Sequence, residues 1–261
     1  MRLGVILAPM ADPAAVIEAA RVAEAEGLDA VGLWDHYHSG QPDWAYAAGW
    51  SVLGALATAT ERVQIVPMVL NGLLHDVGRL AKETAMLDLL SGGRFELGIG
   101  IGDWPEAFAA WGQKFPPRTD RTARLTETLQ ALDALWQGEP VTTAGTHVRL
   151  DGAISTPTPS SPVRIVGGTG GSRRVLDDLA PLVDELNVYA EPNLIEAARE
   201  AADGPGRCSA VSVYYDWSWD HWPADPRAAL AEIAGLGVDR AFLAIAGQDT
   251  NRRVVELAAA R

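Results

Sequence analysis

The chain has 261 residues, of which 48% are hydrophobic and 21% are charged, so it can bury a large core. Its 34 acidic residues outnumber the 21 lysines and arginines and give a formal charge of -13, which is unlike the basic character of nucleic-acid binders. The single cysteine, Cys208, excludes an internal disulfide and any multi-cysteine metal site.

The amino-terminal segment, MRLGVILAPMADP, contains one basic residue and a short apolar run that a proline ends. Such a segment is too short for a secretory signal or a membrane-spanning helix. We therefore expect a cytoplasmic protein that binds a small molecule rather than a membrane or a nucleic acid.

Short apolar runs rich in Val, Ile and Leu alternate with amphipathic stretches along the chain. Strands are predicted at 3–9, 30–35, 63–71, 94–102, 163–168, 185–190, 209–216 and 240–247. Helices are predicted at 13–26, 44–60, 77–90, 119–137, 172–182, 193–202, 225–236 and 250–260. Continuous apolar strands separated by helices are typical of parallel sheets that are covered on both faces.

Eight strand–helix units of about 30 residues each predict a (β/α)8 TIM barrel, whose usual length of ~250 residues matches this chain. We expect one barrel domain over residues 1–261, and a doubly wound open sheet is the alternative. The segment 138–162 interrupts the pattern, and we expect a hairpin at 141–150 and a loop there.

In such barrels the reacting groups lie at the carboxyl ends of the strands. After the second predicted strand come Asp35, His36 and His38. The pair Asp35 and His36 suits proton transfer or contact with a cofactor ring, although polar loop residues that cap the next helix would look the same. We expect no metal here, because no comparable His or acidic clusters follow the other strands.

After the fourth strand come Gly98, Gly100, Gly102 and Asp103. Glycine at every second position of a strand leaves one face without side chains, so a flat ring could lie against it, but tight packing explains the pattern equally well. The third glycine of the dinucleotide fingerprint is not at the required spacing, which argues against a Rossmann site.

After the fifth strand comes a glycine-rich turn that opens a helix. Backbone N–H groups at such a turn form an anion site, and an adjacent arginine adds charge. We therefore predict phosphate binding by these residues: Gly167, Gly168, Thr169, Gly170, Gly171 and Arg173.

After the seventh strand, the segment 217–222 holds three of the nine tryptophans. Large aromatic residues on a loop suit a substrate wall, a lid or a subunit contact, and the sequence does not distinguish these.

The run LAKETAMLDLLSGGRFELGIGIG at 80–102 resembles the most recognisable stretch of the bacterial luciferase-like family, the flavin- and deazaflavin-dependent barrels. Asp35-His36, the run at 115–117 and Gly167-Gly168 support the resemblance, which covers about residues 1–190. It implies an oxidoreductase that holds coenzyme F420 or, alternatively, FMN, with the phosphate at Gly167 to Gly171.

The resemblance also implies a cis peptide bond at Met68–Val69, in a bulge that supports the ring. It places His36 and Asp103 near the hydride-donating carbon, although relatives often have Glu at the second position. Relatives are often homodimers through the second and third helices, and the stretch 44–56 would suit that contact.

Arginine outnumbers lysine 19 to 2, which is typical of the G+C-rich genomes in which deazaflavin is common. We therefore expect hydride transfer between F420 and a small organic substrate. The alternatives are a monooxygenase that uses reduced FMN and O2, a non-catalytic flavin-binding barrel, and a metal-assisted hydrolase.

Overall fold

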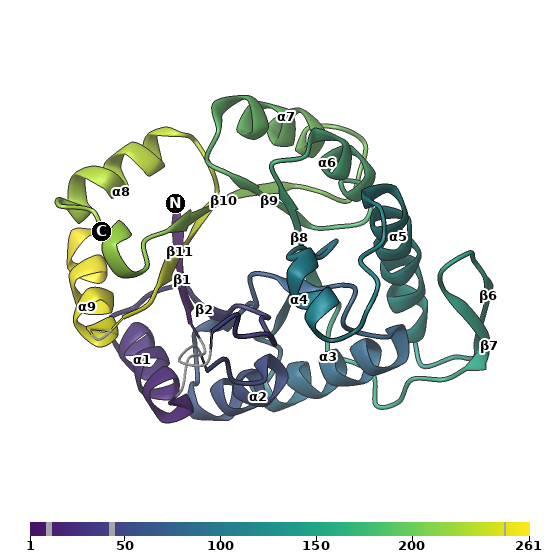
Figure 1. Ribbon diagram of the computed structural model, residues 1–261. Coiled ribbons are helices and arrows are strands. Elements are labelled where there is room, and N and C mark those ends of the chain that lie inside the picture. Colours follow the sequence, from purple (N-terminus) through teal and green to yellow (C-terminus); the bar gives the residue numbers. More distant parts are fainter. Residues whose placement is uncertain (9–11, 42–44, 248) are drawn as a thin grey trace.

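The computed structural model of the chain describes residues 1–8, 12–41, 45–247 and 249–261. Parallel strands and helices alternate along it, as the apolar runs predict (Figure 1). The strands are β1 (Arg2–Leu7), β2 (Ala30–Leu33), β3 (Gln64–Ile65), β4 (Leu70–Asn71), β5 (Glu96–Gly100), β6 (Val141–Ala144), β7 (Arg149–Ala153), β8 (Arg164–Gly170), β9 (Glu185–Tyr189), β10 (Ala210–Asp216) and β11 (Arg240–Ile245). The α-helices are α1 (Pro13–Ala25), α2 (Gly49–Ala59), α3 (Val77–Ser91), α4 (Pro105–Ala110), α5 (Arg118–Leu135), α6 (Arg173–Leu179), α7 (Pro192–Ala202), α8 (Pro226–Gly235) and α9 (Thr250–Ala260).

The main sheet closes into a barrel. Its strand order is β3-β2-β1-β11-β10-β9-β8-β5-β4 with parallel neighbours, and β3 and β4 are two parts of the third predicted strand. The N–H of Ile65 in β3 donates to the carbonyl oxygen of Arg94 at 3.0 Å, and β4 pairs with β5. The third strand is thus bonded on both sides, and the fold is the predicted (β/α)8 TIM barrel.

The third strand is not continuous over 63–71 as expected. Residues 66–69 form a bulge between β3 and β4 that stays bonded to β2 through the N–H groups of Val66 and Met68, and the Met68–Val69 peptide bond within it is cis, as predicted. The second helix begins at Gly49 rather than at 44, and Trp44 lies outside the described residues. Helix α4 was not expected from the sequence.

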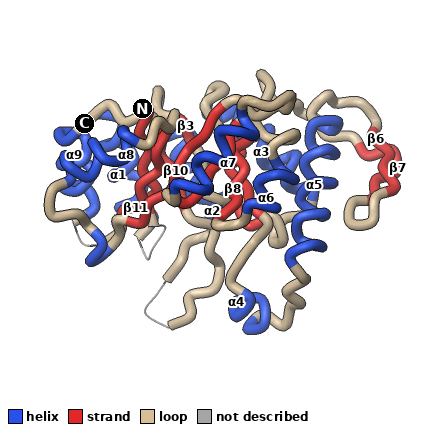
Figure 2. Tube along the Cα trace, turned by 90° about the horizontal axis from the view of Figure 1, so that it is seen from above, coloured by secondary structure: helices blue, strands red, loops and turns tan. Residues whose placement is uncertain are grey.

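The helices form a ring around the barrel (Figure 1). In α5 one apolar face is buried: Leu125, Leu129 and Leu132 are at most 2% exposed, and Trp136, which directly follows the helix, is 9% exposed. The predicted hairpin forms from the antiparallel strands β6 and β7 and projects beyond this ring (Figures 1 and 2). Among the described residues, no helix is long and apolar enough to span a membrane.

An ion cluster fills the barrel at the amino ends of the strands. The Arg240 guanidinium, fully buried, donates to Glu185 at 2.8 and 3.1 Å and to Glu96 at 2.5 and 3.2 Å. Burial raises the pKa of Glu185, but Arg240 outweighs this effect and the pKa is lowered. The Arg240 guanidinium also lies 4.5 Å from the ring centre of Phe242, which belongs to the apolar layer above it. This end of the barrel is therefore packed shut.

The carboxyl ends of the strands carry the long loops. The loop after β2 packs against the α4 region, since the Tyr37 and Trp111 rings stack with centres 5.8 Å apart and the His38 ring lies 5.5 Å from that of Trp104. Helix α4 lies beyond the end of the barrel in Figure 2. Together these segments build a wall above the strand ends.

Candidate active site

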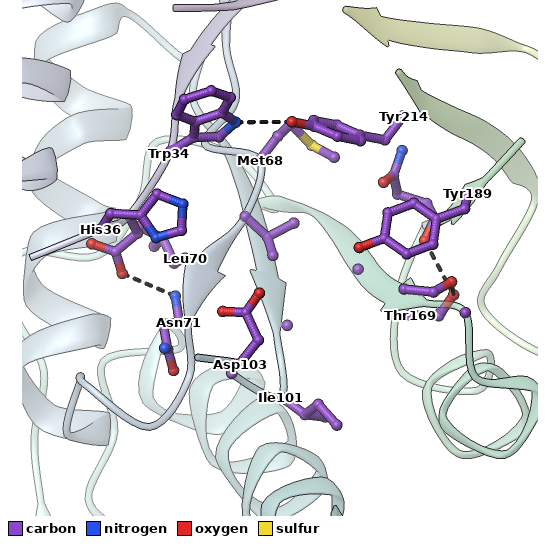
Figure 3. A pocket seen from close by; sticks show the side chains of 18 of the residues that line it. Trp34, His36, Met68, Leu70, Asn71, Ile101, Asp103, Thr169, Tyr189 and Tyr214 are labelled. Atoms are coloured by element: carbon purple, nitrogen blue, oxygen red, sulfur yellow. Dashed lines mark hydrogen bonds between the residues drawn. The ribbon is translucent and has the colours of Figure 1, made fainter. Parts of the chain in front are cut away.

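A cavity of about 650 Å³ opens at the carboxyl ends of the strands (Figure 3). It brings together residues that lie far apart in the sequence. Most of the predicted site residues line it: Asp35, His36, Met68, Val69, Gly100, Gly102, Asp103, Gly168, Thr169, Gly170 and Gly171.

Two predicted cofactor-binding residues, Gly167 and Arg173, do not line this cavity. A Cβ at Gly167 would lie 3.0 Å from a Val183 methyl carbon, so this glycine faces the outer helices. The Arg173 guanidinium pairs instead with Asp177 at 2.9 Å and Glu200 at 3.4 Å on the surface.

Two aromatic residues form the floor of the cavity. The Trp34 indole N–H donates to the Tyr214 hydroxyl at 3.0 Å (Figure 3), and both rings pack on the apolar layer inside the barrel. Burial raises the pKa of Tyr214 far above its ordinary value. The phenol is therefore neutral at physiological pH and can offer only a hydrogen bond.

The bulge fills the space that the glycines leave. A Cβ at Gly98 would overlap the Pro67 carbonyl oxygen, and one at Gly100 or Gly168 would lie 3.0 or 2.9 Å from the Val69 methyl carbons. Of the two explanations of the glycine repeat, these distances favour tight packing at Gly98 and Gly100, because both glycines accommodate the bulge. Met68 and Val69 supply the apolar surface of the cavity instead.

Asp35 is held by hydrogen bonds beneath the mouth of the cavity. Its Oδ2 accepts from the Asn71 N–H at 2.9 Å and lies 2.8 Å from His75 Nε2. His75 Nδ1 accepts from the Trp50 indole N–H at 3.2 Å, so the histidine proton lies on Nε2 and is donated to Asp35. This chain joins the loop after β2 to the residues that follow β4.

Asn71 and Gly102 lock the next loop in place. The Asn71 Oδ1 accepts from the Leu73 N–H at 3.1 Å, and a Cβ at Gly102 would overlap that same oxygen. The φ of Gly102 is 83°, which glycine adopts without strain. Any other residue at this position would displace the adjoining Asp103.

His36 lies among aromatic rings and carboxylates. Its ring centre is 5.4 Å from Tyr46 and 5.3 Å from Trp104, both in edge contacts. Burial lowers the pKa of His36, and Asp103 and Asp35 raise it only in part. At neutral pH the imidazole is therefore neutral and able to accept a proton.

The fifth predicted strand is longer than expected: β8 runs to Gly170, so only Gly171 and Ser172 lie between it and α6, and this short connection offers unpaired donors. The Thr169 hydroxyl donates to the Asn187 carbonyl oxygen at 3.2 Å, and Ser172 caps α6 by accepting from the Val175 N–H. Within the described part of the chain, the N–H groups of Gly171 and Arg173 have no acceptor. Such groups are suited to an anionic oxygen.

The tryptophan-rich loop divides between two roles. Trp217 is buried and packs against Trp222 with ring centres 5.8 Å apart. Trp219 lines the cavity, and its ring centre lies 5.9 Å from that of Trp34. Trp217 thus supports the fold, and Trp219 forms part of the cavity wall.

Further residues line the cavity that the sequence did not indicate: Tyr46, Asn71, Arg118, Asn187, Tyr189 and Tyr214. Four of them lie in or next to predicted strands, where their position near a carboxyl end is a usable signal. Tyr46 and Arg118 lie in loop and helix segments that bear no such signal. Among the described residues, no group of three or more His, Cys, Asp or Glu side chains is arranged to hold a metal ion.

The chain is similar to curated F420-dependent glucose-6-phosphate dehydrogenases. It is 30% identical to that of Nakamurella multipartita over 203 residues, which cover 75% of this chain and 60% of the relative. It is 32% identical to that of Segniliparus rotundus, over 82% of this chain and 68% of the relative. The chain thus spans only about three fifths of the length of the Nakamurella enzyme.

The fold is similar to that of an F420-dependent secondary alcohol dehydrogenase solved with an F420-acetone adduct. The TM-score is 0.85 at 19% identity, and the match covers 100% of this chain and 98% of the other. Residues 1–207 match the luciferase-like monooxygenase family, which includes the motif at 80–102. The chain is therefore a member of the luciferase-like monooxygenase family.

Proposed function

We propose that this chain is an oxidoreductase that uses coenzyme F420 to transfer a hydride to or from a small organic substrate. One observation carries the proposal: a single cavity gathers His36, Asp103, the cis bulge at Met68–Val69 and the glycine-rich turn at 168–171. Relatives at 30 to 32% identity are named as F420-dependent enzymes, which favours the deazaflavin over FMN.

The residues of the cavity fit such a coenzyme. A volume of about 650 Å³ lies within the range of ~300–1,000 Å³ for small-molecule sites. Met68 and Val69 offer an apolar surface to a flat ring, and Gly171, which directly follows β8, offers to a phosphate an N–H group that is free among the described residues. Arg118 also lines the cavity and adds a positive charge to a lining that is otherwise mostly acidic.

When bound, the oxidised coenzyme would supply the acceptor for a hydride, which is two electrons and one proton, that leaves a substrate carbon bearing a hydroxyl group. A ring nitrogen of His36 takes the hydroxyl proton, and the substrate leaves as a carbonyl compound. The lowered pKa of His36 keeps its lone pair available at neutral pH. Asp103 stabilises the imidazolium that results, because its negative charge faces the ring.

We assign Asp35 a positioning role rather than proton transfer. Its Oδ2 already accepts from Asn71 and His75, so its lone pairs serve the fold of the cavity rim. The adjacent His36 is thereby held at the mouth of the cavity.

Titration of the apoprotein with F420 and, separately, with FMN tests the coenzyme directly. Coenzyme fluorescence should report saturable binding of F420 at concentrations at which FMN stays free. Tighter binding of FMN would favour the monooxygenase, and the absence of binding by either compound would refute the proposal.

We further propose that the chain works in the cytoplasm as a homodimer through α2 and α3. Three large apolar side chains of α3 are exposed, Met86 and Leu89 at 42% and Leu90 at 49%. A Cβ at Gly54 of α2 would meet no atom within 4 Å, which leaves room for a partner helix. Sedimentation velocity should detect a dimer that Leu90→Glu dissociates and the exposed control Val255→Glu preserves. Dissociation by neither variant would contradict this surface.

A further inference from the structure

The charged groups that line the cavity are mostly acidic. In the described part of the chain, the basic side chains that line it are Arg118 and His36, whereas Asp35, Asp103 and Asp216 contribute three carboxylates. The undescribed residues, 9–11, 42–44 and 248, include no Lys, Arg or His. Those segments therefore cannot contribute a further basic side chain to the cavity.

Arg118 lies on the side of the glycine-rich turn. It also borders a neighbouring groove of about 320 Å³ that is lined by Arg174 and Val175 of α6, and α6 begins directly after that turn. The charge of Arg118 is thus next to the donors that we assign to the coenzyme phosphate. It is not available to a second anion at the opposite wall.

Arg253 approaches the opposite wall, but both of its terminal nitrogen atoms are engaged, and its Nε is buried without a hydrogen-bond partner among the described residues. Its Nη1 donates to the Ala246 carbonyl oxygen at 2.8 Å and its Nη2 to the Trp219 carbonyl oxygen at 2.7 Å. Its guanidinium lies 5.3 Å from the ring centre of Trp222, and the residue does not line the cavity. Arg253 therefore supports the loop that carries Trp219.

That opposite wall is aromatic. Trp219 lies beside Trp34, which belongs to the floor, and Tyr46 lies beside His36, with ring centres 5.9 and 5.4 Å apart. The carboxylate at its edge, Asp216, is engaged too, because it accepts from the Ser218 N–H at 2.9 Å. Aromatic faces bind apolar groups well, whereas a phosphate dianion needs charge-assisted donors to replace its hydration.

Resting on the function proposed above, we infer that the substrate is an uncharged alcohol, or the matching carbonyl compound, with an apolar body. That body packs against Trp34, Tyr46 and Trp219, and its oxygen faces His36. The cavity thus selects against a phosphorylated sugar, the substrate in the name of the curated relatives.

The test compares probes on the F420-loaded protein. Binding and kcat/KM are measured for 2-propanol, cyclohexanol, benzyl alcohol, glucose 6-phosphate and the cation cyclohexylamine. We expect at least one uncharged alcohol to exceed glucose 6-phosphate in kcat/KM by about tenfold or more. Its KM should not change with ionic strength, because salt screens only charged ligands. Preference for the phosphate or the amine, or no binding of any alcohol, would overturn the inference.

A pair of variants tests the role of charge. Tyr46→Arg places a cation on the aromatic wall and should raise the affinity for glucose 6-phosphate several-fold, whereas Tyr46→Gln is polar but uncharged and should not. Equal effects of the two variants would show that charge does not exclude the phosphate, and would also overturn the inference. Failure of F420 to bind would refute the proposed function instead, so the two failures are distinguishable.

Discussion

Gly168→Ala perturbs the contact between β8 and the bulge. The new Cβ would lie 2.9 and 3.1 Å from the two Val69 methyl carbons, closer than van der Waals contact allows, while the backbone at Gly168 is one that alanine also adopts. Overpacking of this kind costs about 1–3 kcal/mol. If the whole cost falls on the coenzyme complex, the Kd for F420 rises about 5- to 150-fold.

A second substitution makes the reasoning testable. Val69→Ala removes both methyl carbons that the new Cβ meets, so Gly168→Ala/Val69→Ala should bind F420 more tightly than Gly168→Ala alone. Fluorescence titration gives the Kd of each variant, and thermal unfolding separates loss of binding from loss of folding. The control is Gly235→Ala, because a Cβ there meets nothing within 4 Å. Wild-type affinity of Gly168→Ala, or a double variant no better than the single one, would refute the proposed packing.

His36→Ala should lower kcat on the order of 10²-fold with the Kd for F420 within several-fold, and an unchanged kcat would remove the residue from the mechanism. Since burial lowers the pKa of His36 more than Asp103 raises it, kcat/KM for oxidation should rise with pH to a plateau, and the midpoint of the rise should lie below the ordinary histidine value of about 6.5. Asp103→Asn should move this limb to lower pH, and a shift to higher pH would contradict the assignment. His75→Leu should weaken F420 binding, whereas His75→Gln, which keeps a donor toward Asp35, should largely restore it; equal loss in both would argue against the positioning role. Arg240→Met removes the buried cation from Glu96 and Glu185 and leaves the partly exposed Arg164 beside them, at 3.8 and 3.1 Å, so it should lower the free energy of unfolding by about 3 kcal/mol at pH 7. Urea unfolding should show less loss near pH 5 than at pH 7, because burial without Arg240 favours the protonated form of Glu185, and an equal loss at both pH values would contradict this account.

The barrel could be predicted because its strands are continuous apolar runs with helices between them. The break in the third strand could not be predicted from those runs, because residues 63–71 look like one strand. The bulge exists because Gly32 and Gly98, on the two flanking strands, leave room for the Val66 and Pro67 carbonyl groups. That information lies in three separate segments of the sequence, and only the resemblance to a family pointed to Met68–Val69.

The site could be predicted where strand ends carry polar or glycine residues, as at His36, Asp103 and Thr169. The hydrogen bond that engages the Asp35 carboxylate could not be predicted, because its partner His75 lies 40 residues away in the chain. For the same reason Arg173 looked suitable for a phosphate, although its guanidinium pairs with Glu200 on a different helix. Sequence position indicates which residues reach the rim, but side-chain direction depends on neighbours that are distant in the chain.

The Arg240 cluster limits the routes by which ligands can enter and leave the cavity. Buried ions fill the amino end of the barrel and apolar side chains fill the layer above it, so among the described residues the cavity is closed at that end and ligands reach it through the opening at the carboxyl ends of the strands. Reactant, product, water and the proton released at His36 must all use it, so the ligand that sits deeper has to enter first and leave last. Because the cavity is closed at one end, initial-rate measurements should show that the two ligands bind in a compulsory order.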